Sequence, residues 1–151
     1  MEQSKDFPDA FHRVTVKGLC VRGDKLLMMR ESETLSHGDW ELPGGGLDFG
    51  EDIRKGFERE VKEEMGLQVT KMSKRPVYAW THKYESRRDL DWYYALVLCY
   101  RVDFKTLDII PSDECEEIKF FTQDELHDIK IIGQMTSLPG IFDVKDFTEP
   151  F

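Results

Sequence analysis

The sequence predicts an α/β fold in which helices cover a mixed β-sheet. β-rich segments lie on both sides of one long helical segment at about residues 51–65, and a shorter helical segment follows near residue 122. With 151 residues the chain is long enough to bury one core. We therefore expect residues 1–151 to form a single domain.

The first part of the chain predicts a hairpin followed by a glycine-rich loop. Residues 12–31, HRVTVKGLCVRGDKLLMMRE, predict two short strands with Gly23 and Asp24 in the turn between them. Residues 32–39 are polar and turn-forming. Residues 40–51, WELPGGGLDFGE, predict a loop flanked by short extended pieces.

The helical segment has an apolar stripe and a glycine stop. The apolar residues recur every four positions at Ile53, Phe57, Val61 and Met65, and Gly66 follows where a glycine commonly ends a helix. Gly56 lies inside this segment and costs about 1 kcal/mol relative to alanine. We therefore expect another stretch of backbone to pass close to it.

The second half of the chain is mostly extended. Residues 67–84 predict β structure with a break at Pro76, and residues 85–91 predict a charged turn. Residues 92–102, WYYALVLCYRV, give the strongest strand signal in the chain.

An acidic loop and a short helix complete the pattern. Residues 111–117, PSDECEE, form the loop, and IKFF after it predicts a short strand. Thr122 and Glu125 have the spacing of a capping box at the start of a helix. We expect the tail after Pro139 to be irregular.

Charge and composition exclude several classes of protein. The net charge of −9 leaves no basic stripe for phosphate contacts, so stable nucleic-acid binding is not expected. The chain has no run of 18 apolar residues and no secretion signal at its start, so no membrane association is expected. Cys20 and Cys99 lie in apolar runs and predict small core residues, and the absence of paired cysteine spacing favours a reduced, cytoplasmic setting.

Three glutamates of the helical segment admit two interpretations. Glu60, Glu63 and Glu64 are spaced i, i+3, i+4 and project from one face that borders the apolar stripe, which suits a hard dication. The alternative is an ordinary solvated helix, because oppositely charged i, i+4 pairs such as Glu58–Lys62 are also present. The glycine loop at residues 44–46 favours the first interpretation, since glycines let backbone approach a ligand and precede a helix N-terminus.

The full spacing resembles a known motif. Gly45, five residues, Glu51, seven residues, Arg59-Glu60, an apolar residue, any residue, Glu63-Glu64, any residue, Gly66 and an apolar residue match every fixed position of the Nudix box. Similar segments flank the box, so the resemblance covers about residues 12–130. It implies a Nudix-type α/β/α sandwich with a mixed sheet.

The resemblance implies a metal-dependent pyrophosphohydrolase that uses Mg²⁺ or Mn²⁺. Glu60, Glu64 and the Gly44 carbonyl would be metal ligands, and Glu63 would ligate directly or through water. Arg59 would orient Glu60, and Glu51 would fix the loop at the helix start. The general base would be Glu63, with a glutamate of the acidic loop as the alternative: Glu114, Glu116 or Glu117.

Substrate contacts are assigned from residue type alone. Arg30 and Glu117 are candidates near the phosphates, Gly45 is a backbone contact, and Trp40 is a candidate for base stacking. The other aromatic candidates, each with a core role as its alternative, are Tyr78, Trp80, Trp92 and Tyr94. His82 could be a base, although a structural histidine is the more common case.

The resemblance leaves more than one function open. The leading expectation is cleavage of a nucleoside diphosphate linked to another group, as in a nucleoside triphosphate, ADP-ribose or a nucleotide sugar. A non-catalytic nucleotide-sensing module is the alternative, and isoprenoid diphosphate isomerisation would need an acid–base pair that we cannot place. Homodimers are frequent in the family, so a homodimer is an expected assembly.

Overall fold

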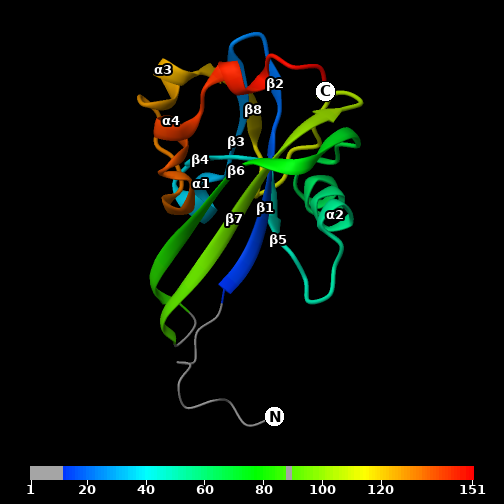
Figure 1. The fold of residues 1–151 in the computed structure, drawn as a ribbon. Helices are drawn as coiled ribbons and strands as arrows, with labels where there is room; N and C mark the ends of the chain where they lie inside the picture. The colour runs from blue at the N-terminus through cyan, green and yellow to red at the C-terminus, as the bar shows by residue number, and fades with distance from the viewer. Residues whose placement is uncertain (1–11, 88–89) are drawn as a thin grey trace.

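Two β-sheets form the centre of the computed structural model, which describes residues 12–87 and 90–151 (Figure 1). The strands of the first sheet, in spatial order, are β5 (Gly44–Gly46), β1 (His12–Leu19), β7 (Leu90–Phe104) and β6 (Val69–Arg87). β1 and β7 are parallel and the other pairs are antiparallel, so the predicted mixed sheet is confirmed. The second sheet is antiparallel and consists of β2 (Val21–Arg22), β3 (Lys25–Arg30), β4 (Trp40–Glu41) and β8 (Glu117–Thr122).

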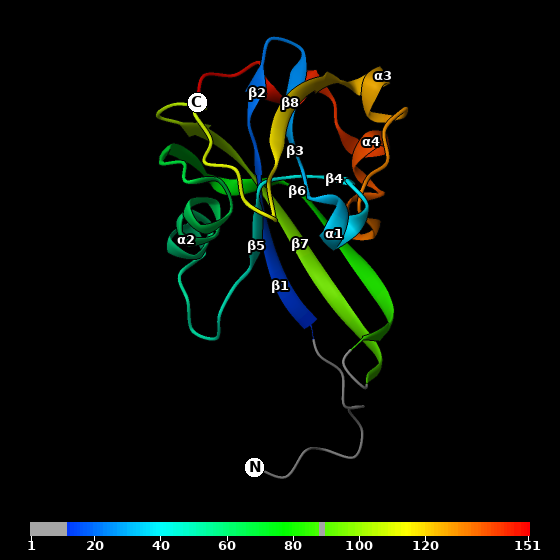
Figure 2. The same ribbon diagram turned by 180° about the vertical axis from the view of Figure 1, so that it is seen from behind.

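Helices lie on both sides of these sheets, as the two opposite views show (Figures 1 and 2). The helix α2 (Ile53–Met65) lies on one side. The opposite side carries α3 (Gln123–Leu126), η1 (Gly133–Met135), α4 (Leu138–Ile141) and η2 (Val144–Phe147), and the short α1 (Glu33–Ser36) precedes β4. The predicted α/β/α arrangement is therefore confirmed.

Strand β1 separates two environments through its alternation. Val16 belongs to the core cluster under α2, and a Cβ at Gly18 would lie 2.5 Å from the Phe57 ring. Thr15 and Lys17, on the opposite face of the same strand, line a cavity. One strand thus supplies both the core and the candidate site.

Helix α2 keeps its predicted stripe but begins two residues later than expected. Asp52 caps the helix, because its side chain accepts a hydrogen bond from the Lys55 N–H at 3.0 Å. Gly66 ends the helix at a φ of +70°. Phe57, Val61 and Met65 are fully buried, as predicted, and Ile53 packs partly buried against them.

The explanation predicted for Gly56 is wrong. A Cβ at this position would lie 2.4 Å from the Leu47 side chain and 2.7 Å from the Glu51 carboxylate. Side chains of the preceding loop, rather than another backbone segment, therefore require the glycine.

The predicted break at Pro76 is a bulge within one long strand. β6 continues through Pro76, with register irregularities against β7 on both sides of it. β6 is an edge strand, so the missing N–H of proline is tolerated. The prediction of a turn at residues 85–91 falls partly on residues 88–89, which lie outside the described residues; on either side of them, β6 extends to Arg87 and β7 begins at Leu90.

The tail after Pro139 is not irregular throughout, which corrects the prediction. Pro139 lies in the first turn of α4, where its missing N–H costs nothing. Leu138, Phe142 and Phe147 are buried in a second core cluster against β7. The capping box of Thr122 and Glu125 is confirmed, although the helix it starts has only four residues.

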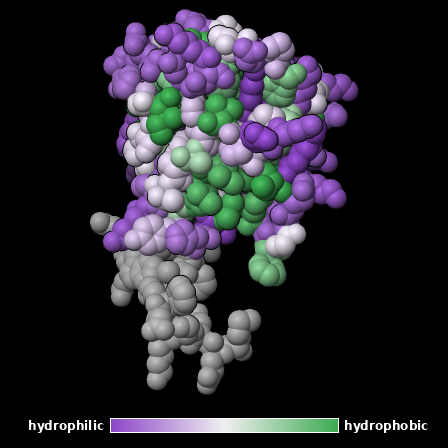
Figure 3. All heavy atoms as spheres, viewed as in Figure 1, coloured by the Kyte–Doolittle hydropathy of each residue, from purple (hydrophilic) through white to green (hydrophobic). Residues whose placement is uncertain are grey.

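The surface of the face seen in Figure 1 is mostly polar, with apolar atoms gathered over β1 and β5 beside α2 (Figure 3). Val14 of β1 and Leu47, which follows β5, are partly buried and pack against the core cluster under α2. Cys20, Cys99 and Cys115 are free and buried, and burial raises the pKa of each thiol, to about 11 for Cys20 and about 12 for the other two. Among the described residues, no helix is both long and apolar enough to cross a bilayer.

Candidate active site

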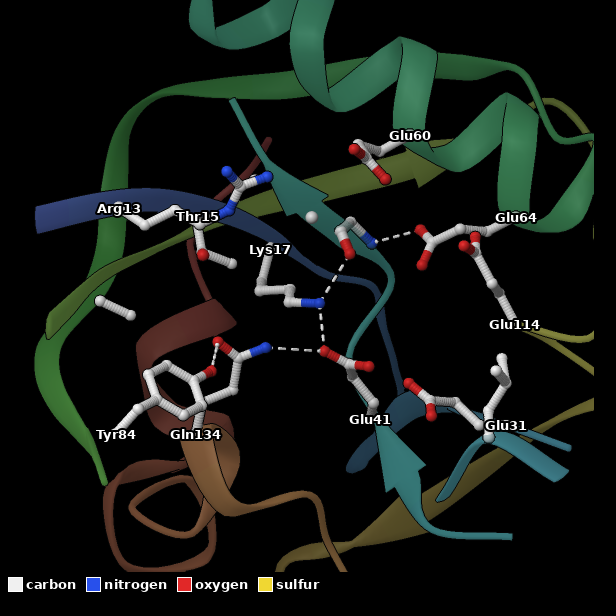
Figure 4. Close-up of a pocket in the computed structure, with 15 residues that line it drawn as sticks. Arg13, Thr15, Lys17, Glu31, Glu41, Glu60, Glu64, Tyr84, Glu114 and Gln134 are labelled. Atoms are coloured by element: carbon white, nitrogen blue, oxygen red, sulfur yellow. Dashed lines mark hydrogen bonds and ion pairs between the residues drawn. The ribbon is translucent and has the colours of Figure 1, made fainter. Parts of the chain in front are cut away.

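An open cavity of about 400 Å³ lies where β1, the β5 loop and α2 meet the segment around Gln134. Its charged lining consists of five carboxylates and two cations: Glu31, Glu41, Glu60, Glu64, Glu114, Arg13 and Lys17. Figure 4 shows the side chains of Glu60 and Glu64 descending from α2, and Glu114 pointing toward Glu64. The cavity is therefore an acidic site with cations on the β1 side.

Glu60 and Glu64 are brought to the glycine loop by their positions on the inner edge of α2. The Glu64 carboxylate is buried and accepts a hydrogen bond from the Gly44 N–H at 3.0 Å. The Glu60 carboxylate lies so close to the loop that a Cβ at Gly45 would be 2.6 Å from one of its oxygens. The structure thus assembles the predicted metal residues Gly44, Glu60 and Glu64, together with Gly45, around one cavity.

Burial shifts the pKa values of both helix carboxylates upward. The pKa of Glu64 is raised well above its usual value by burial, against the opposing effects of Lys17 and the Gly44 N–H. The pKa of Glu60 is also raised by burial, although Arg59 opposes this. Such carboxylates lack a fully compensating positive charge, and their oxygens are the ligand type that a hard dication prefers.

Arg59 is the hub of the contacts beside these carboxylates. Its guanidinium donates to Glu51 at 2.8 and 3.0 Å, to Glu60 at 3.1 Å, to Glu63 at 3.2 Å and to the Gly46 carbonyl at 3.3 Å. Hydrogen bonds from Arg59, and one from the Asp48 N–H, lower the pKa of Glu51 to about 2. These contacts agree with the orienting roles predicted for Arg59 and Glu51.

The predicted base candidates separate in space. Glu114 lines the cavity. The side chain of Glu63 is 58% exposed and does not line the cavity. Glu116 and Glu117 pair with Arg30 at 3.5 and 2.8 Å.

Of the substrate contacts predicted from residue type, Gly45 lines the cavity, whereas Arg30, Glu117 and Trp40 lie outside its lining. Arg30 and Glu117 face each other across β3 and β8, and Trp40 packs edge-on against Phe121 with ring centroids 4.8 Å apart. Trp80 belongs to the second core region and donates its indole N–H to the Gln134 carbonyl. Their substrate roles stay predictions, and the side chain of Trp92 lies outside the described part of the chain.

The remaining aromatic candidates and His82 have structural contacts of their own. The Tyr78 hydroxyl donates to Asp146 at 2.6 Å, and the Tyr94 ring stacks on His12. His82 packs edge-on against Tyr84, with ring centroids 4.7 Å apart.

Sequence reasoning did not anticipate Lys17 as a site residue. Its side chain is 2% exposed, and its ammonium contacts the Glu41 carboxylate, the Gly44 carbonyl at 2.6 Å and the Leu42 carbonyl at 3.3 Å. Burial alone would lower the pKa of Lys17, but the carboxylates of Glu41 and Glu64 outweigh it, and the pKa is raised. The available signal was a charged residue inside the otherwise apolar VTVKGLC, which an amphipathic strand places beside Thr15.

Glu41 links Lys17 to the C-terminal segment. Its carboxylate also accepts a hydrogen bond from the side-chain amide of Gln134 at 3.1 Å, and the Tyr84 hydroxyl donates to the side-chain oxygen Oε1 of Gln134 at 2.6 Å (Figure 4). A continuous chain of hydrogen bonds therefore runs from Tyr84 through Glu41 and Lys17 to the Gly44 peptide and Glu64.

The side chains of the cavity are of the chemical type that binds a cation, but they are not arranged around a single point. Across residues 12–87 and 90–151, no three Asp, Glu, His or Cys side chains converge closely enough to coordinate one ion. Arg59 holds Glu60, and the Gly44 N–H holds Glu64, each by a hydrogen bond that a bound cation would replace or reorient. The donor set of carboxylate and carbonyl oxygens still matches Mg²⁺ or Mn²⁺.

Comparison with known proteins gives one family match over most of the chain. The model of the NUDIX domain matches residues 11–137. A MutT-like protein of Streptomyces ambofaciens is 46% identical over 59 residues, which cover 38% of this chain and 36% of the relative. An NAD-capped RNA hydrolase of Pseudomonas aeruginosa is 27% identical over 109 residues, which cover 72% of this chain and 35% of the relative. The aligned stretches span less than half the length of these curated relatives.

Solved structures resemble the fold over nearly its whole length. The MutT protein of Methanosarcina mazei Go1 has a TM-score of 0.68 at 19% identity, covering 95% of this chain and all of the other. An ADP-ribose pyrophosphatase of Streptococcus suis has a TM-score of 0.64 at 21% identity, covering 93% and 96% of the two chains. At these identities the likeness shows the shared fold.

Proposed function

The chain belongs to the Nudix family, and we propose that it is a divalent-metal-dependent pyrophosphohydrolase that cleaves a nucleoside diphosphate linked to another moiety. The observation that carries the proposal is the meeting of Glu60, Glu64 and Glu114 with the loop Gly44–Gly46 around one cavity. A solvated surface helix would not explain why the Glu64 carboxylate is buried against the loop. The complete box therefore coincides with a built site.

Glu60, Glu64 and the Gly44 carbonyl would hold Mg²⁺ or Mn²⁺, and Glu63, which does not line the cavity, would join only through water. A dication bound there would neutralise the diphosphate and lower the pKa of a bound water. Arg59 would position Glu60, because a guanidinium held by Glu51 is fixed before the metal arrives. The chain's own contribution is thus a preorganised set of oxygens on a rigid helix.

Glu114 is the better-supported general base. It lines the cavity beside Glu64, whereas Glu63 is largely exposed and engaged by Arg59. A base must reach the proton that it accepts, directly or through one water. The position of Glu114 satisfies this requirement more readily.

The substrate class follows from the chemistry of the box and of the opposite wall. Arg13 and Thr15 on β1 face the acidic wall across the cavity and would contact phosphate or ribose oxygens. Relatives and neighbours are named for NAD-capped RNA, 8-oxo-dGTP and ADP-ribose. We therefore propose a nucleoside triphosphate, ADP-ribose or a nucleotide sugar as the substrate. A homodimer and a cytoplasmic setting complete the proposal, and the three free cysteines agree with a reducing compartment.

The test is a panel of these nucleotides with Mg²⁺ or Mn²⁺, in which release of phosphate, pyrophosphate or nucleoside monophosphate is measured. We expect turnover of at least one substrate and a loss of kcat of roughly 10²–10³-fold or more in Glu64→Gln. Glu58→Gln is the matched control, because Glu58 lies on the same helix but outside the cavity lining, with its side chain 41% exposed, and pairs with Arg54 at 2.9 Å. Full activity of Glu64→Gln would refute the proposed site.

The same panel separates the alternative function. A nucleotide-sensing module would bind a nucleotide, detected by calorimetry, without forming product at saturating metal. That the box retains all its carboxylates favours the enzyme.

A further inference from the structure

The Gly44 peptide is held at both of its polar atoms. Its N–H donates to Glu64 at 3.0 Å, and its carbonyl accepts from the Lys17 ammonium at 2.6 Å. Gly44 has a φ of +113°, and a Cβ there would lie 2.2 Å from the Val16 carbonyl oxygen. This peptide is therefore fixed on β1 with little freedom to move.

Lys17 makes more contacts with the loop than neutralising the charge of Glu41 requires. An ammonium has three donors, and Lys17 directs them at the Glu41 carboxylate and at the carbonyls of Leu42 and Gly44. Glu41 already receives a second hydrogen bond, from Gln134. The contact with Gly44 is thus an additional interaction, aimed at the carbonyl proposed as a metal ligand.

A dication bound to this carbonyl would lie close to the Lys17 ammonium, which is buried and cannot move into solvent. Lys17 is 2% exposed on a strand paired on both sides, by β5 and β7. A carbonyl oxygen has two lone pairs, so ammonium and metal can share it, but the two cations then repel each other in a poorly solvated site. The interaction between Lys17 and the metal is therefore antagonistic.

We propose that the buried Lys17 ammonium holds the Gly44 carbonyl when no dication is present, and that it weakens the binding of a dication at this carbonyl. This inference rests on the proposed metal site. Because coupling between two sites is reciprocal, the same antagonism means that bound metal loosens the hold of Lys17 on the loop. Lys17 is a positioning residue, and its effect is on metal affinity.

The experiment measures Mn²⁺ affinity by electron paramagnetic resonance titration, without substrate. Lys17→Met alone would leave Glu41 as a lone buried charge, so the effect of Lys17 is measured in a background that lacks this charge. The comparison is Glu41→Gln against the double variant Lys17→Met/Glu41→Gln. Lys25→Met in the Glu41→Gln background is the matched control. Lys25 is exposed on β3 and lies outside the cavity lining, and its replacement removes the same charge as Lys17→Met.

We expect the double variant to bind Mn²⁺ roughly ten-fold more tightly than Glu41→Gln, and the Lys25 control to change the affinity much less. In EDTA the double variant should melt at a lower temperature than Glu41→Gln, and saturating Mn²⁺ should narrow this difference. An affinity within two-fold of Glu41→Gln, or weaker binding in a variant whose circular dichroism is native, would overturn the inference alone. Absence of Mn²⁺ binding by the unmodified protein would instead overturn the proposed metal site, and with it this inference.

Discussion

Replacement of Gly44 by alanine tests the geometry of the metal loop most directly. At a φ of +113° an alanine costs about 1–3 kcal/mol in backbone strain. Its Cβ would also lie 2.2 Å from the carbonyl oxygen of Val16, a backbone atom of a paired strand that cannot turn aside. Forcing that contact adds about 1–3 kcal/mol, as overpacking does in a close-packed core.

The two costs together predict a fall in the melting temperature on the order of 10 °C for a chain of this size. Gly50→Ala is the control, because Gly50 has a φ of +77° but no atom within 4 Å of its Cβ. It should cost about 1–2 kcal/mol from the backbone alone. Differential scanning calorimetry gives the melting temperatures of both variants for comparison. If Gly44→Ala melts within about 2 °C of Gly50→Ala, the close approach of Gly44 to β1 is wrong.

Two further predictions concern the general base and the ion pair between Glu51 and Arg59. Glu114→Gln should lower kcat by roughly 10²-fold with little change in KM, as loss of a general base does, and the same loss in Glu63→Gln instead would return that role to Glu63. The pKa of Glu51 is about 2 in the folded protein against a usual 4.5, so its stabilising contribution is present above pH 4.5 and is lost as the pH falls toward 2. The free energies of unfolding of the unmodified protein and Glu51→Gln, measured in urea, should therefore differ most near pH 6, approach each other as the pH falls below 4.5 and converge near pH 2, and a constant difference would contradict the role of Arg59.

The parts of the site that lie on one helix were predictable from sequence. The periodicity of Phe57 and Val61 identifies the buried stripe, and the positions of Glu60 and Glu64 relative to it place their carboxylates at the edge of the core. Such relations depend on spacing within about three turns, which one sequence contains in full. The helix start was missed by two residues because the capping role of Asp52 was not recognised.

The parts of the site that different elements bring together were not predictable in the same way. The burial of Lys17 depends on how β1 pairs with β5 and on where Glu41 ends β4, and no local pattern encodes that meeting. The tail was misjudged for a similar reason, since Leu138 and Phe142 are spaced too sparsely for a periodic signal and are ordered by packing against β7. Arg30 resembled a phosphate ligand by type, yet the register of β3 and β8 places it opposite Glu117.

The alternation of β1 has a consequence for how this protein can change. Thr15 and Lys17 face the cavity, while Val14 and Val16 face the helix layer. One face of β1 therefore contacts the ligand, and the other face packs in the core. Single substitutions at Arg13 and Thr15 should change ligand preference without repacking the interior, whereas Lys17 is tied to the buried Glu41. A one-residue insertion or deletion, by contrast, would exchange the two sides at once. Directed evolution of this chain should therefore find new substrates by point changes along β1 and fail by length changes there.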